Sequence, residues 1–186
     1  MLKSHSNSPS LVRQQAAVSL RTFGWIGFWT QLIFTAAAGV VLLFAVADPN
    51  LNINLKSGFG LFSALGSILV LCLSIYWFFR YTRFSKQLEA SESSLHPSRK
   101  ETIRTLQTGV LINLVGMLLI LVGIELVMGS LLGKTLSVPQ GAAIYRSSQL
   151  IEPLDIFVVQ ANINMIVAQF VGIAIPFWLA TRIEQH

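Results

Sequence analysis

The chain of 186 residues is 53% hydrophobic and only 11% charged, whereas a soluble domain carries about 25% charged residues. So few charges cannot cover a water-facing surface, which excludes an ordinary soluble domain, and this length suits a single domain. The formal net charge of +5 does not indicate nucleic acid as a partner, because the basic residues lie at the ends of apolar blocks and no nucleic-acid motif is present.

The N-terminal residues before the first apolar block are polar and mildly basic, so they resemble the start of a signal peptide. The apolar stretch that follows is far longer than the roughly 7–15 residues of a signal-peptide core. We therefore expect this stretch to be a helix that is retained in the mature protein and not cleaved off. A long transit peptide rich in serine and arginine is not evident, so we expect a bacterial protein or a mature organelle protein.

Four apolar blocks each supply the roughly 20 residues that a membrane-spanning helix needs. Strands are excluded, because in lipid only helices and closed barrels satisfy the backbone, and the alternating segments of a barrel are absent. The predicted fold class is all-α, a polytopic membrane protein with four transmembrane helices. Residues 1–22 form a cytoplasmic segment, 23–182 the membrane domain and 183–186 the tail. The expected spans are about 23–47, 59–79, 106–132 and 154–180.

Basic residues are distributed unevenly around these blocks. All lysines and arginines except Lys56, Lys134 and Arg146 fall before the first block, between the second and third, or after the fourth. Because cytoplasmic segments carry the excess of Lys and Arg, we expect both termini and the loop 80–105 on the cytoplasmic (or stromal) side. The tryptophans lie toward that face, as an aromatic belt would: Trp25, Trp29, Trp77 and Trp178.

The loops contain three local signals. Ser98 can cap a helix, and Glu101 follows three residues later, as in a capping box; this helix should run straight into the third span. On the other side of the membrane, Val138–Gly141 predicts a turn and Ala142–Leu150 a short interfacial helix. We find no convincing internal repeat, so an inverted-repeat transporter is not supported.

Small residues recur along the third span. Such residues let helix backbones approach closely where van der Waals contact drives association. One interpretation is packing within the bundle, and the other is an interface with a second copy or a partner subunit. The residues are Gly109, Gly116, Gly123 and Ser130 at intervals of seven, with Gly129 and Gly133 as a further pair.

The fourth span is polar on two faces. Asp155, Asn162 and Gln169 form one stripe at intervals of seven, while Gln160 and Asn164 lie on nearly the opposite side. A helix that is polar on two faces needs protein or water on both. We therefore expect it to lie centrally in the bundle or against a partner.

Glu125 stands inside the third span, and Asn113 lies deeper in the same helix, roughly level with residues 169–173 of the fourth span. A carboxylate at the helix centre costs about 2.5–3.5 kcal/mol on insertion scales. Two interpretations stay open: a proton-coupled or cation-coordinating group, or a protonated or amide-paired side chain that locks two helices together. By depth, Glu125 should lie near Gln160 and Asn162, between the third and fourth helices and in the outer half of the bilayer.

These oxygens could form a cage for a hard cation, but no clear metal signature is present and the metal stays unknown. The histidines lie outside the spans, and methionine in an apolar helix is usually a filler. The single cysteine, Cys72, excludes an intrachain disulfide. Because no phosphate-binding loop, nucleophile elbow, zinc-protease motif or dinucleotide fingerprint is present, we expect no enzyme. The candidate intramembrane site is Glu125, Asn113, Asp155, Gln160, Asn162 and Gln169.

Several stretches together resemble one family, over about residues 21–183. It is the chloroplast inner-envelope family described both as an iron permease and as a component of the inner-envelope protein translocon, together with its cyanobacterial homologues. No single stretch is specific, but the combination is. The stretches are RTFGWIGFW at 21–29, WFFRYTR at 77–83, INLVGM at 112–117, PQGA at 139–142 and LDIFVVQAN at 154–162.

The resemblance implies a four-helix membrane bundle and one of two roles. The first is transport of iron or another divalent metal such as manganese, with the ion as cargo and no resident cofactor evident. The second is a non-catalytic subunit or assembly factor of a protein translocon or photosynthetic complex. It also implies a cyanobacterial plasma or thylakoid membrane, with the chloroplast inner envelope for plant relatives. In either role we expect contact with the lipid bilayer and a homo-oligomer or heterologous membrane subunits.

Overall fold

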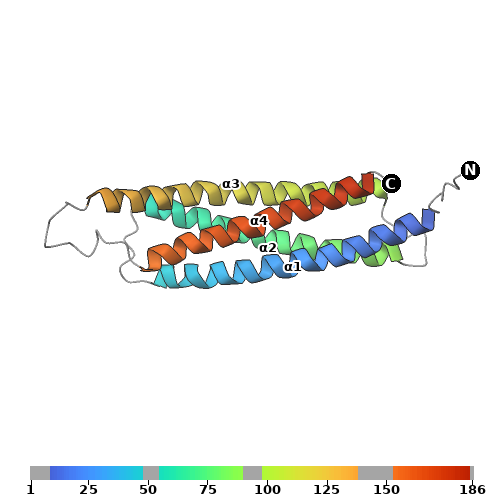
Figure 1. Cartoon of the computed structure of the whole chain (residues 1–186), viewed down its shortest axis with the longest axis horizontal. Helices are drawn as coiled ribbons and strands as arrows, with labels where there is room; N and C mark the ends of the chain where they lie inside the picture. Colours follow the sequence, from blue (N-terminus) through green and yellow to red (C-terminus); the bar gives the residue numbers. More distant parts are fainter. Residues whose placement is uncertain (1–8, 48–54, 90–97, 138–152, 185–186) are drawn as a thin grey trace, which may run out of the picture.

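The computed structural model describes residues 9–47, 55–89, 98–137 and 153–184, which form four long helices. Figure 1 shows them side by side as one elongated bundle, with the start of the first helix and the end of the last at the same end. Each is long and apolar enough to cross a membrane, so the predicted all-α, four-span fold is confirmed. The helices are α1 (Pro9–Ala47), α2 (Leu55–Glu89), α3 (Arg99–Ser137) and α4 (Pro153–Glu184).

We call the end where α1 begins and α4 ends the terminal end, and the opposite end the distal end (Figure 1). All four helices extend beyond the predicted spans, most of all at the terminal end. Residues 80–89, expected in a loop, instead continue α2. They contain neither glycine nor proline, and Tyr81, Phe84 and Ser85 are buried against the neighbouring helices. Hydropathy marks the lipid-embedded part of a helix, not the point where the helix ends.

The predicted helix start at Ser98 is confirmed. The Glu101 backbone N–H donates to Ser98 Oγ at 3.1 Å, and the Thr102 N–H donates to the Ser98 carbonyl at 3.0 Å. Ser98 therefore caps the free N–H groups of the first turn of α3. The turn at 138–141 and the short helix at 142–150 lie outside the described residues.

The helices pack in a ring in which α1 contacts α2, α2 contacts α3, α3 contacts α4 and α4 contacts α1, with a smaller contact between α2 and α4. Serines of α2 form hydrogen bonds to the backbones of neighbouring helices. Ser63 donates to the carbonyl of Leu119, and Ser85 donates to the carbonyl of Ala17 at 2.9 Å. Small hydroxyl residues at helix contacts are typical of membrane bundles.

Two apolar clusters fill the bundle interior at different heights. The terminal cluster consists of Leu20, Phe78, Tyr81, Leu106, Leu179 and Ala180. The distal cluster consists of Ala38, Leu42, Ala64, Leu71, Ile120, Ala161, Met165 and Ala168. The outward faces are also apolar: Leu43, Phe62 and Leu69 are each more than 70% exposed. Lipid covers such faces in an integral multi-pass membrane protein.

Aromatic and basic side chains meet at the terminal end. The Arg80 guanidinium lies 4.6 Å from the Trp77 ring centroid, and that of Arg182 lies 5.1 Å from the Trp178 ring centroid. Trp25 and Trp29 are exposed on α1. This combination is typical of a membrane–water boundary, where indole rings and basic side chains anchor helices.

Candidate functional site

A cluster of uncharged polar side chains lies in the bundle interior, near mid-length. Asn113 Oδ1 accepts from Gln31 Nε2 at 2.9 Å and from Ser74 Oγ at 2.9 Å. Asn113 Nδ2 lies 2.7 Å from Ser74 Oγ and donates to the Gly109 carbonyl at 2.9 Å. The Asn113 side chain therefore joins α3 to both α1 and α2.

Gln31 extends the cluster to the fourth helix, because its Nε2 also donates to the Ala168 carbonyl at 3.1 Å. Gln169, the next residue of α4, is fully buried. We call Gln31, Ser74, Asn113 and Gln169 the amide cluster; one residue comes from each helix.

Several polar atoms in this region have no hydrogen-bond partner. Both side-chain polar atoms of Gln169 and Oε1 of Gln31 are buried without one, and so is Oδ1 of Asn162, two turns away in α4. An unpaired buried polar group costs about 1–3 kcal/mol, so a fully inert core would rarely retain this many. Neighbouring protein groups therefore do not satisfy the hydrogen-bonding capacity of these side chains.

Two glycines make room for the cluster. A Cβ at Gly116 would lie 2.1 Å from Gln169 Nε2 and 2.7 Å from Val70 Cγ1. A Cβ at Gly172 would lie 2.1 Å from Asn113 Oδ1 and 2.4 Å from Gln31 Nε2. The amides thus occupy the space that any larger residue would fill.

Proline supplies a further feature at the same level. Pro176 lies inside α4 and has no backbone N–H, so the carbonyl of Gly172, four residues earlier, lacks its usual helical donor. Gly172 is the residue that abuts Asn113 and Gln31. The Gly172 carbonyl therefore has no helical N–H donor at the level of the amide cluster.

The amide cluster lies between the two apolar clusters. Along α1, Gln31 falls between Leu20 and Ala38, and along α3, Asn113 falls between Leu106 and Ile120. In α4, Gln169 falls between Met165 and Leu179. The polar atoms are therefore separated from both ends of the bundle by packed hydrophobic side chains.

The chemistry of the cluster is that of neutral oxygen donors. Amide and backbone carbonyl oxygens suit hard cations and water. Within the described ranges, no group of three or more His, Cys, Asp or Glu residues could hold a metal ion.

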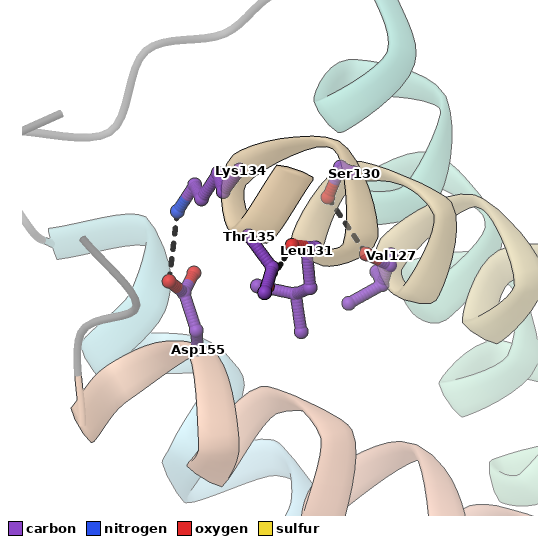
Figure 2. Close-up of polar contacts among 6 residues, drawn as sticks. All are labelled: Val127, Ser130, Leu131, Lys134, Thr135 and Asp155. Carbon is purple, nitrogen blue, oxygen red and sulfur yellow. Dashed lines mark hydrogen bonds and ion pairs between the residues drawn. The ribbon is translucent and has the colours of Figure 1, made fainter. Parts of the chain in front are cut away.

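Asp155, predicted as part of the site, instead lies at the distal end of the bundle. Figure 2 shows Lys134 of α3 and Asp155 of α4 pointing toward each other, with Lys134 Nζ 2.7 Å from Asp155 Oδ2. Nearby hydroxyls bond within α3: Ser130 donates to the Val127 carbonyl and Thr135 to that of Leu131 (Figure 2). The ion pair ties α3 to α4 at the point where α4 begins.

Glu125 does not join the buried residues, contrary to the position expected from its depth. It is exposed on the outward face of α3. It lies nine residues beyond the buried Gly116, and nine residues make about two and a half helical turns, which places it on the opposite face. Depth fixes the height of a residue in the membrane but not the direction in which its side chain points.

The two polar faces expected on α4 are both present. Asn162 and Gln169 are buried, whereas Gln160 is exposed and its Nε2 donates to Asn164 Oδ1 at 3.1 Å. The expected level of Asn113, beside residues 169–173, agrees with its closeness to Gly172. Among the sequence-predicted residues, the structure brings together Asn113 and Gln169, with Asn162 two turns away.

The glycines of α3 divide into two groups. Gly109, Gly116 and Gly123 are buried in the bundle, which supports the interpretation of close intramolecular packing. Gly129 and Gly133 have open space where a side chain would be. These two remain candidates for an intermolecular contact.

Sequence reasoning missed Gln31, Ser74 and the role of Gly172. It placed no candidate site residue in the first two spans, although each contributes a residue to the amide cluster. A signal was present: Gly24, Gly27 and Gln31 recur at helical spacing on α1 and are all buried. Small and polar residues at that spacing mark an inward face even in an otherwise apolar helix.

Two comparisons with known proteins found a match. The family model described as "Protein of unknown function (DUF3611)" matches residues 10–184. The chain belongs to this family. It is also 29% identical, over 158 residues, to "Protein TIC 21, chloroplastic" of Arabidopsis thaliana. The match covers 82% of this chain and 52% of the relative, so the chain spans about half the length of that protein. No solved structure matches.

Proposed function

We propose that this protein is a membrane-transport component that passes iron(II) or manganese(II) across a membrane of a photosynthetic organism. The observation that carries the proposal is Gln169, whose two side-chain polar atoms are buried without partners. Its amide lies against Gly116, one helical turn from Asn113 on α3. The family resemblance supports the choice of cargo, and the neutral oxygen donors support a hard divalent ion.

The absence of a carboxylate from the amide cluster fits passage better than storage. A site of neutral oxygens leaves a divalent ion much of its hydration shell and binds it weakly, so the ion can leave again. Conduction requires binding strong enough for entry and weak enough for release. Glutamine, asparagine, serine and the Gly172 carbonyl would replace only some of the waters.

The two apolar clusters then act as closed gates on either side of the site. Transport requires each gate to open in turn, and α4 is the helix best suited to move. Pro176 removes a helical hydrogen bond and Gly172 has no side chain, and such residues permit a bend in a helix. A bend at this level would move Leu179, in the terminal cluster, relative to Met165, in the distal cluster.

A second candidate function is a non-catalytic subunit or assembly factor of a protein translocon or photosynthetic complex. The observation that favours it is the same pair of packed apolar clusters, because a bundle closed at both ends can act as a scaffold without conducting anything. Under this alternative the amide cluster only fixes the pairing of the four helices.

Ion flux distinguishes the two candidates. The purified full chain is reconstituted into liposomes that enclose a metal-quenched dye, and Mn²⁺, Fe²⁺ or K⁺ is added outside. Transport predicts quenching by Mn²⁺ and Fe²⁺ above that of protein-free liposomes, with no matching K⁺ flux in a parallel potential-dye assay. Flux equal to protein-free liposomes, together with recovery of a fixed heterologous complex in gentle detergent, would reject transport in favour of the scaffold role.

A further inference from the structure

The outward faces of α3 and α4 carry polar groups at one level of the membrane. The two helices are antiparallel neighbours, and Gly116 of α3 lies against Gln169 of α4. Glu125 lies nine residues beyond Gly116, and Gln160 lies nine residues before Gln169. Because the helices run in opposite directions at the same rise per residue, Glu125 and Gln160 lie at the same depth.

Both side chains point away from the bundle. Nine residues make about two and a half turns, so each lies opposite its buried reference residue, and both are exposed. Among the described residues Glu125 has no ion pair or hydrogen bond from its side chain. A carboxylate facing lipid is costly, so something must cover it.

The complementary donors are present on the same chain. Gln160 Nε2 donates one N–H to Asn164 Oδ1, but an amide nitrogen carries two. The second N–H of Gln160 and those of Asn164 Nδ2 have no acceptor among the described residues. One outward face therefore offers an acceptor, and the other offers donors at matching depth.

We propose that this protein self-associates in the membrane, with Glu125 on α3 of one copy hydrogen-bonded to the Gln160 and Asn164 amides on α4 of a second copy. An axis along the bundle relates the copies, so each residue keeps its depth. Gly129 lies one turn from Glu125 and has nothing within 4 Å of a Cβ position, which lets the second copy approach closely. The contact uses the second polar face of α4, which the bundle interior leaves uncovered.

Disulfide cross-linking in native membranes tests this interface. Cys72 is replaced by alanine in two full-length copies that carry different tags. One copy receives Val122→Cys and the other Ile163→Cys; each position lies three residues from its polar neighbour, at matching depth, and both are exposed. The control pairs Ile163→Cys with Leu43→Cys, which is exposed on α1. The product is read on a non-reducing gel with both tags.

The expected result is a doubly tagged product for Val122→Cys with Ile163→Cys and little for the control pair. Adding Glu125→Leu should lower its yield about threefold or more, as loss of one interhelical hydrogen bond in a membrane predicts. Glu125→Gln still accepts a hydrogen bond, so it should leave the yield of the cross-linked product unchanged.

Three outcomes would overturn the proposal: no product above the control pair, a product insensitive to Glu125→Leu, or cross-links only to a different protein. The last would identify a heterologous subunit as the occupant. The assay detects a covalent product and no flux, so its result is independent of whether the protein transports metal.

Discussion

Asn113 Oδ1 and Gln31 Nε2 lie 2.9 Å apart and join α3 to α1, the two helices that do not adjoin in the ring of packing contacts. The bond crosses the middle of the bundle. It brings together residues 82 positions apart in the sequence. In the proposed transport role, an ion at the centre of the bundle would meet this pair.

Removing Asn113 should destabilise the bundle. Asn113→Ala deprives Gln31 and Ser74 of a partner, and leaving buried polar groups unpaired costs about 1–3 kcal/mol each. We expect a clear drop in Tm in detergent, measured by intrinsic fluorescence. The control is Gln107→Ala, an exposed amide on the same helix, which should change Tm little. Equal Tm values for the two variants would contradict a structural role for the Asn113 bonds.

Gly172→Ala should destabilise the bundle more than a glycine-to-alanine substitution at an uncrowded position. Its Cβ would lie 2.1 Å from Asn113 Oδ1, and overpacking of this kind costs about 1–3 kcal/mol. Gly39→Ala is the matched control, because nothing lies within 4 Å of its Cβ position and alanine favours a helix by up to about 1 kcal/mol. We expect Tm to fall for the first and to hold or rise for the second. The opposite order would show that the amides can move aside.

The ion pair at the distal end should contribute little to stability. Lys134 and Asp155 retain side-chain exposures of 32% and 27%, and partly exposed pairs contribute roughly 0–1 kcal/mol. A double-mutant cycle with Lys134→Ala and Asp155→Ala, read by thermal unfolding, should give a coupling within that range. A coupling several times larger would mean that the pair is shielded from solvent by lipid or by a partner.

Replacing Gln169 separates stability from function. Its amide makes no hydrogen bond in the closed bundle, so Gln169→Leu removes a desolvated polar group while filling a similar volume. We expect Tm to rise or stay unchanged, because replacing such groups with apolar ones is nearly neutral or stabilising. A marked fall in Tm would instead show that Gln169 locks the helices together and would favour the scaffold role.

The sequence predicted the helices well because lipid imposes a strict length and a strict hydropathy on each span. It also placed Asn113 at the level of residues 169–173, since rise per residue fixes relative depth once the ends are known. It failed for Glu125 because depth carries no information about direction around the helix axis. Gln31 was not predicted, because a single amide in a long apolar block is not a distinctive signal. Its position becomes informative only when Gly24 and Gly27 are placed on the same helix face.

Mn²⁺ entry into liposomes, compared between wild type and Gln169→Leu at equal protein content, tests the central claim most directly. The variant must first unfold at or above the wild-type temperature, so that a loss of entry does not reflect lower stability. Our account predicts rapid dye quenching for wild type and a loss of about tenfold or more for Gln169→Leu, the change that about 1.4 kcal/mol in the barrier produces. Equal entry through both proteins, or no entry through wild type, would contradict it.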